Sequence, residues 1–262
     1  MISEKSLPII PAGIARIFFA VALVGFGFQQ FIFKIIIIGR PPAWPTWLPE
    51  ETIFAYITGL LIVSSGLAII INRWAVQTLM ATGIFVLAWA GLQNVYLVVA
   101  HLDLGANLTF MGKSLTLGFG ALLTATTFRH DENYNASIFN SPILKLASWC
   151  RYGTGLFLFF SGVQHFLYAE FVQSLVPSWI PGGLFWTYFA GAALAAAGLG
   201  LITGIKAHLA ATLAGWMVLT WLIILHIPRA IAMSNQNEWT AVFEALAITG
   251  VLFMLSDSLK KK

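Results

Sequence analysis

The chain has 262 residues, of which 59% are hydrophobic and only 9% are charged, and its mean hydropathy is +0.85. This balance excludes an ordinary soluble globular protein, in which about 25% of residues are charged. The single cysteine excludes an internal disulfide, a CxxC redox pair and a cysteine-based metal cluster. The formal net charge of +4 does not indicate nucleic-acid binding, because the basic residues are scattered between the apolar segments.

Eight apolar segments follow one another along the chain, and each is near the roughly 20 residues that a helix needs to cross a bilayer. In chain order they cover residues 12–34, 52–71, 75–100, 107–128, 148–170, 184–203, 206–228 and 239–256. They lack the short alternating pattern that is typical of strands in a membrane barrel. The sequence therefore predicts an all-α, polytopic membrane bundle of eight transmembrane helices.

A polar stretch, residues 129–147, divides the chain into two halves, 1–128 and 148–262, which resemble each other. Aligned residues include Gly27 with Gly162, Gln29 with Gln164, Gln30 with His165, Trp47-Leu48-Pro49 with Trp179-Ile180-Pro181, Asn94 with His226, and Lys113 with Glu244. Each half has an even number of spans, so both halves enter the membrane from the same side. We therefore expect two parallel four-helix repeats related by a pseudo-twofold axis along the membrane normal, joined by a cytoplasmic linker.

Lysine and arginine are distributed unequally between the two sets of loops. Ten of the 14 lie in or beside the N-terminus, the loop after the second span, the central linker, the loop after the sixth span and the C-terminus. The positive-inside rule places these segments in the cytoplasm. We expect both termini to be cytoplasmic, with the other loops outside.

Polar side chains within the predicted spans gather near the outer ends of those spans. The candidate site residues are Gln29, Gln30, Asn94, Lys113, Gln164, His165, His226, Arg229 and Glu244. Polar and ionisable residues in a span are costly and tend to face the bundle interior or a water-filled cavity. The sequence therefore predicts one polar pocket in the outer leaflet.

Lys113 and Glu244 occupy equivalent positions in the two halves and carry opposite charges. They could form an ion pair near the pseudo-twofold axis, where pairing would offset the cost of burial. Alternatively, each could face a polar pocket of its own or extend to the membrane interface.

His165 and His226 lie at the outer ends of neighbouring predicted spans, where they could hold a haem or a metal. The first half has Gln30 and Asn94 at these positions, and no third ligand has suitable spacing. We therefore expect no metal site and no haem, and we expect histidines that hydrogen-bond to their neighbours. Arg229, which follows a proline, could bind an anion or a lipid headgroup, or could simply end the span at the interface.

Several segments of the second half resemble bacterial DoxX-like integral membrane proteins. They are Arg151 to Gly162 with their glycine spacing, Gln164-His165-Phe166, Trp179-Ile180-Pro181, the glycine-rich sixth span, and Asn237-Glu238-Trp239-Thr240 leading to Glu244 and Gly250. The family is built on a four-helix unit, so the resemblance implies two fused units in a bacterial cytoplasmic (inner) membrane. Some members are linked to quinone-coupled sulfur oxidation or to membrane redox assemblies. The resemblance supplies no motif with an agreed catalytic role.

Three functions fit the predicted pocket. The chain could be an accessory membrane component that binds a lipid or another lipophilic molecule, a subunit of a quinone-linked oxidoreductase, or a structural subunit of a larger membrane complex. The sequence lacks a nucleophile triad, a nucleotide loop and a cofactor motif, which favours the accessory role over an autonomous enzyme. We expect no bound cofactor, with a quinone as a candidate ligand and with membrane lipids or membrane proteins as partners.

Overall fold

The computed structural model describes residues 10–40, 44–45, 48–100 and 105–260. Within these residues the protein is helical and contains no β-strand, so the predicted all-α class is confirmed. Trp47, one of the residues that align between the two halves, lies outside the described residues.

The helices follow one another in two groups around a short linker. The first group comprises α1 (Ala12–Phe33), α2 (Glu51–Ile71), α3 (Ala75–Trp89), the π-helical turn η1 (Ala90–Asn94), α4 (Val95–Ala100) and α5 (Ala106–Thr126). The linker holds η2 (Ala136–Asn140), α6 (Pro142–Lys145) and η3 (Leu146–Trp149). The second group comprises α7 (Cys150–Leu167), α8 (Ala169–Leu175), α9 (Gly183–Thr203), α10 (Ala207–Trp221), the π-helical turn η4 (Leu222–His226), α11 (Ile227–Met233) and α12 (Gln236–Ser258).

Seven helices in the described part of the chain are long and apolar enough to cross a membrane, and there are eight if a bent pair counts as one span. The seven are Ala12–Phe33, Glu51–Ile70, Ala75–Ala100, Ala106–Thr126, Gly183–Thr203, Ala207–Met233 and Gln236–Ser258. The bent pair joins Pro142–Leu167 to Ala169–Leu175 at an angle of 101°. These helices suit a multi-pass membrane protein.

The fifth predicted span, residues 148–170, does not run straight to its end. At Tyr168 the backbone has φ −117° and ψ 38°, which lies outside the helical region, and the chain turns into α8. One side of α8 contributes Phe171, Val172 and Leu175 to a cavity wall. Because hydropathy measures apolar length and not direction, the sequence could not distinguish this short helix from the end of a span.

The seventh predicted span, residues 206–228, also differs from the structure, because the helical path continues to Met233. A π-helical turn, η4, precedes Pro228 and places it in the first turn of α11. The wider π-helical turn accommodates the proline, which lacks a backbone N–H, within the continuous helical path. The proline therefore does not end the span.

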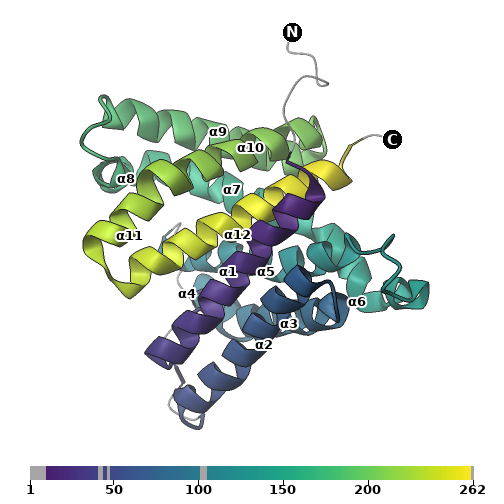
Figure 1. Ribbon diagram of the computed structural model, residues 1–262. Helices are drawn as coiled ribbons and strands as arrows, with labels where there is room; N and C mark the ends of the chain where they lie inside the picture. The colour runs from purple at the N-terminus through teal and green to yellow at the C-terminus, as the bar shows by residue number, and fades with distance from the viewer. Residues whose placement is uncertain (1–9, 41–43, 46–47, 101–104, 261–262) are drawn as a thin grey trace.

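Each group of helices packs mainly within itself, and the two groups meet along α1, α5, α7 and α12. In the first group α1 packs on α2, α2 on α3 and α3 on α5, and in the second group α7 packs on α9, α9 on α10 and α10 on α12. The groups are joined because α1 also packs on α12, α5 on α7 and α5 on α12. Figure 1 shows α1 and α12 side by side, with the start of α1 and the end of α12 at one end of the bundle. We call the opposite end, where α7 ends and α12 begins, the α8 end.

Helices α7 and α9 approach each other closely at two glycines. A Cβ atom on Gly162 would lie 2.5 Å from the backbone nitrogen of Ala195 and 2.6 Å from the carbonyl oxygen of Gly191. Small residues of this kind let membrane helices pack backbone against backbone. The first half repeats the contact, since a Cβ on Gly27 would lie 2.8 Å from the carbonyl oxygen of Gly59.

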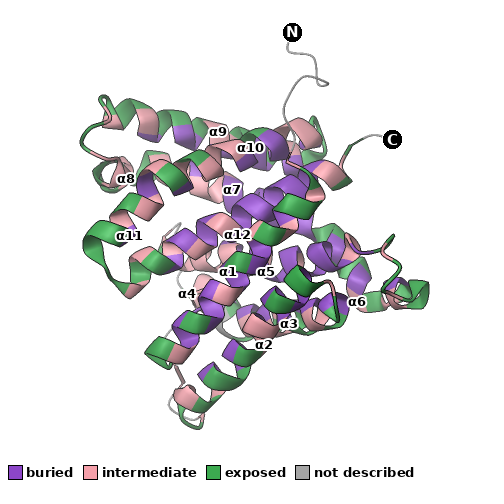
Figure 2. Ribbon diagram, in the orientation of Figure 1, coloured by how far each residue is buried: buried purple, intermediate pink, exposed green. Residues whose placement is uncertain are grey.

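Burial follows the position of each helix in the bundle. Buried residues gather along α12 and the helices beside it, whereas the outward faces are exposed (Figure 2). Many exposed side chains are large and apolar, among them Phe28, Ile57 and Leu60. Such faces suit contact with lipid, because the helices satisfy their own backbone hydrogen bonds.

Candidate functional site

A cavity of about 760 Å³ lies at the α8 end of the bundle, between α5 of the first group and the helices of the second. Its apolar walls come from residues such as Phe157, Leu158, Leu194, Trp221 and Ile248. Six of the nine predicted site residues line it: Lys113, Gln164, His165, His226, Arg229 and Glu244. The fold thus brings together polar residues from α5, α7, η4, α11 and α12.

Glu244 is the buried centre of the polar side of the cavity. Its side chain is only 3% exposed, and its Oε2 lies 2.7 Å from Nζ of Lys113. Lys113 and Glu244 therefore form a direct ion pair, one of the three alternatives that the sequence left open, and the alternatives of separate pockets or extension to the interface are wrong. Pairing offsets much of the cost of burying this carboxylate.

Arg40 provides a second cation for the same carboxylate, and the sequence does not indicate this contact. Its Nε lies 2.9 Å from Oε1 of Glu244, and its Nη2 donates to the Asn237 carbonyl oxygen at 3.1 Å. In the sequence, Arg40 is only one basic residue in an outer loop. No local pattern indicates that the loop reaches α12, so only the fold reveals this contact.

Arg40 reaches the site because the chain after α1 folds back into the bundle. Ile36, Ile37 and Ile38 are 4%, 4% and 2% exposed, respectively. Positive φ angles at Lys34 and Arg40, 59° and 49°, turn the chain at the two ends of this segment. We call residues 36–38 the plug, because they fill the first half of the bundle.

Gln30 and Asn94 do not line the cavity, because both make contacts within the first half, where Gln30 holds the plug. Gln30 accepts a hydrogen bond from the backbone N–H of Ile37 at 3.2 Å and donates to the Thr58 hydroxyl at 2.8 Å. Asn94 donates to the Ser114 hydroxyl at 3.0 Å. Their polar atoms therefore serve contacts within the first half and are not available to the cavity.

Gln29 also lies outside the cavity. Its Nε2 donates to the Gln236 carbonyl oxygen at 3.3 Å, and its Oε1 accepts from the Thr240 hydroxyl at 3.3 Å. The side chain thus joins α1 to the start of α12. Both ends of the amide are occupied by this helix contact.

Gln164, which aligns with Gln29, joins α7 to the start of α5 in the same manner. Its Nε2 donates to the Gly105 carbonyl oxygen at 2.9 Å, and its Oε1 accepts from the Thr109 hydroxyl at 2.7 Å. Unlike Gln29, Gln164 also borders the cavity. It positions the wall of the site and leaves ligand contacts to its neighbours.

The two histidines present their imidazole rings to the cavity. Nδ1 of His165 lies 2.7 Å from the Ser161 carbonyl oxygen, to which it donates its proton, so Nε2 remains for a ligand. Within the described residues, the ring of His226, at the end of η4, makes no hydrogen bond. Nor do any three His, Cys, Asp or Glu side chains in this part of the chain lie close enough together to hold a metal ion.

Arg229 borders the cavity and is held by a carboxylate. Its Nη2 lies 2.7 Å from Oε1 of Glu238, and its Nε donates to Oε2 at 3.2 Å. This two-point contact fixes the guanidinium more firmly than a single bond would. Arg229 is therefore an oriented cation beside the cavity.

The matching region of the first half is filled by its own side chains. Phe26 is fully buried there, whereas the aligned residue of the second half, Ser161, borders the cavity. The plug fills more of the same region. In the second half the corresponding stretch forms α8, which lies across the end of the bundle and leaves the space open.

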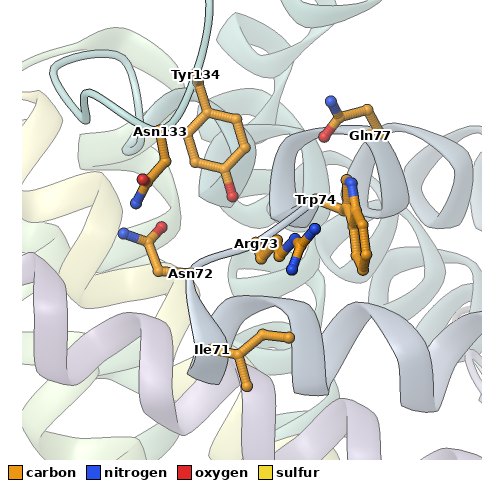
Figure 3. Close-up of a pocket in the computed structure, with 7 residues that line it drawn as sticks. All are labelled: Ile71, Asn72, Arg73, Trp74, Gln77, Asn133 and Tyr134. Carbon is orange, nitrogen blue, oxygen red and sulfur yellow. The ribbon is translucent and has the colours of Figure 1, made fainter.

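A smaller cavity of about 370 Å³ lies at the opposite end, where the turn after α2 meets the linker. Figure 3 shows its seven lining residues, with the Tyr134 hydroxyl pointing toward the turn. That hydroxyl accepts from the Ala75 backbone N–H at 3.0 Å. The guanidinium of Arg73 lies over the Trp74 ring, 4.2 Å from its centre.

Asp131 anchors the linker beside this smaller cavity. Hydrogen bonds from the Asn133 backbone N–H and from the Asn72 amide lower the pKa of the Asp131 carboxyl. Burial raises the pKa of the nearby Tyr134 hydroxyl. These contacts explain why the polar linker is ordered against the turn after α2.

Comparison of the chain with protein-family models, with curated proteins and with solved structures finds no match. The large cavity is therefore the main basis for inferring a function.

Proposed function

We propose that this protein is an accessory membrane component that binds a lipid or another lipophilic molecule in the cavity at the α8 end. The observation that carries the proposal is a cavity of about 760 Å³ that combines apolar walls with charged residues at one side. Binding sites for small molecules typically have about 300–1,000 Å³ and a few polar groups that orient the ligand. An amphiphilic molecule matches both features.

A role without chemistry is supported by the state of the two carboxylates. Glu244 contacts Lys113 and Arg40, one with each oxygen, and both oxygens of Glu238 contact Arg229. A general base must be free to take a proton from a bound substrate. Carboxylates held by cations in this manner are better suited to positioning than to proton transfer.

We propose further that the bundle consists of two parallel repeats, 1–128 and 148–262. The repeated packing order supports this arrangement, as do the π-helical turns that end at the aligned residues Asn94 and His226. The third helix of each half also starts after an aligned residue in the left-handed conformation, Trp74 or Lys206. Two fused four-helix units are what a DoxX-like protein of this length would contain.

The proposed setting is a bacterial cytoplasmic membrane with both termini in the cytoplasm. The start of α1 and the end of α12 lie at the same end of the bundle (Figure 1), and this position, together with the excess of basic residues in the segments assigned to the cytoplasm, supports the orientation. The large cavity then opens in the outer leaflet, and the smaller one faces the cytoplasm.

A quinone-linked oxidoreductase subunit is the second candidate. The observation that favours it is the pair His165 and His226, whose rings border the cavity. His226 could donate to a carbonyl oxygen of a quinone, and Nε2 of His165 could accept from a hydroxyl of the reduced quinol. A quinone would be one of the lipophilic ligands that the test below detects.

The test is to purify the protein in a neutral detergent, extract it and identify bound molecules by mass spectrometry. We expect a stoichiometric lipophilic molecule in the wild type and its loss in Ser161→Phe, which introduces the residue that fills the first half. Thr220→Phe, at an exposed position on α10, is the matched control and should retain the molecule. An empty wild-type protein, or retention by Ser161→Phe, would refute the proposal. A quinone in the extract would favour the second candidate, and a stoichiometric protein partner with no bound lipophile would favour a structural subunit.

A further inference from the structure

We infer that the ligand of the large cavity is an amphiphile whose headgroup carries one negative charge. This inference rests on the proposed lipophilic ligand and names its chemical class. The observation behind it is the imbalance of charge around the cavity. Three cations, Arg40, Lys113 and Arg229, border it together with two carboxylates, Glu238 and Glu244.

The extra positive charge lies at the polar side of the cavity, because one carboxylate is shared. Glu238 is matched by Arg229 alone, whereas Glu244 is contacted by both Lys113 and Arg40. These two cations are largely buried, with side chains 18% and 22% exposed. An unbalanced charge away from water is costly, and an anionic ligand would remove that cost.

The same two cations retain hydrogen-bond donors for a ligand. A lysine ammonium group has three N–H donors, and Lys113 uses one of them for Glu244. Arg40 has five donors, and its bonds to Glu244 and to the Asn237 carbonyl use only Nε and Nη2. Carboxylate and phosphate oxygens are the strongest partners for such donors.

The first half indicates where a hydrogen-bond acceptor of the ligand should lie in the second half. There the Gly39 carbonyl oxygen, next to the plug, accepts from Ser114, which also accepts from Asn94. The residues that align with Asn94 and Ser114 are His226 and Ala245. The alanine side chain cannot donate a hydrogen bond. A ligand oxygen at the matching place must therefore accept from His226 and from the neighbouring cations.

The remainder of the cavity suits an acyl chain. Its other walls include Phe157, Leu158, Leu194 and Ile248, which offer no strong hydrogen bond to a ligand. A neutral, fully apolar molecule would leave the excess positive charge unmatched, and a dianion would give the occupied site a net negative charge. An amphiphile with an acyl chain and a carboxylate or a phosphate diester head satisfies both parts of the cavity.

The experiment compares two probes that differ only in their head, oleate and oleyl alcohol, by binding to the full-length protein in neutral detergent. We expect oleate to bind at least about tenfold more tightly, which corresponds to about 1.4 kcal/mol. Phosphatidylglycerol and phosphatidylcholine with identical chains form a second pair, which shows whether the anionic head belongs to a free fatty acid or to a phospholipid.

Charge variants give changes of opposite sign. Lys113→Gln removes the excess charge and leaves Glu244 paired with Arg40, so we expect oleate affinity to fall about tenfold. Glu244→Gln removes a carboxylate, so oleate affinity should rise by a similar factor. Lys34→Gln, which removes a charge at the same end without touching the cavity, is the matched control, and thermal unfolding verifies that each variant is folded.

A role that is only structural would not raise the affinity of one variant and lower that of the other. Equal binding of oleate and oleyl alcohol, unchanged by Lys113→Gln, would overturn the inference and leave the proposed lipophilic ligand intact. If neither probe pair binds and the purified protein is also empty, the proposed function itself is wrong.

Discussion

Lys113 of α5 and Glu244 of α12 meet at the contact between the two groups of helices, with Nζ 2.7 Å from Oε2. These residues align between the two halves of the sequence but have opposite charges. In the structure they form an ion pair with each other. Arg40 completes the contact on the other oxygen. The buried carboxylate therefore joins three segments that are far apart along the chain.

A charge exchange should reveal the direct pairing of Lys113 and Glu244. We expect Lys113→Glu and Glu244→Lys each to destabilise the protein by about 3–5 kcal/mol, because each leaves buried like charges unpaired. The double exchange should recover part of this loss, limited by Arg40, which then faces a cation. The measurement is thermal unfolding in detergent. A double variant no more stable than either single variant would exclude direct pairing.

Removal of the amide that holds the plug should destabilise the first half. Gln30→Leu leaves the buried backbone N–H of Ile37 without an acceptor, and we expect a loss of about 1–3 kcal/mol of unfolding free energy. Gln173→Leu, at an exposed position on α8, is the control and should change stability little. Equal stability of the two variants would contradict the role assigned to Gln30.

The close approach of α7 and α9 predicts a strong effect for a single methyl group. Gly162→Ala places Cβ 2.5 Å from the Ala195 backbone nitrogen, so we expect about 1–3 kcal/mol of destabilisation. A Cβ on Gly91 meets no atom within 4 Å, and Gly91→Ala should therefore be neutral or slightly stabilising. Thermal unfolding of both variants checks the contrast, which would be absent if the helices did not pack backbone to backbone.

The contact between Asp131 and Asn72 should make stability depend on pH. The pKa of Asp131 is lower in the folded protein than its ordinary value of 3.8, so the ionised carboxylate stabilises the fold. That contribution is complete above the ordinary pKa and is lost as the pH falls through the lowered one.

The measurement compares the unfolding midpoints of the wild type and Asp131→Asn between about pH 6 and pH 3. The advantage of the wild type should shrink toward the acid end. Asn72→Ala removes one of the hydrogen bonds and should reduce the difference at every pH. A difference that does not change with pH would show that the carboxylate charge is unimportant.

Much of the fold could be predicted, because the length of each apolar segment and the Pro, Gly and charged residues that bound it are local properties of the sequence. The predicted spans match helices to within a few residues at most ends. The two clear errors, at Tyr168 and Pro228, both concern the direction or continuity of a helix. A hydropathy profile contains neither property. In the fifth predicted span, the backbone of Tyr168 leaves the helical region and bends the chain. In the seventh, a π-helical turn accommodates Pro228.

The candidate site was predicted in part for the same reason. Lys113, His226 and Glu244 were found because charged or polar residues stand out within apolar segments. The same rule selected Gln30 and Asn94, which make contacts within the first half and do not reach the cavity. Arg40 was missed because a basic residue in a loop is unremarkable until the path of that loop is known.

The sequence alone determined that the protein is an all-helical chain of membrane-spanning length, with polar residues near one end of its spans and opposite charges at aligned positions. Only the tertiary structure decided which half contains an open cavity. The difference lies in which side chains occupy the space between the helices. In the first half, Phe26 and the buried isoleucines Ile36, Ile37 and Ile38 occupy it. In the second half, the smaller Ser161 and the turn into α8 leave it free. Such filling depends on contacts between segments distant in the chain, which local patterns do not record.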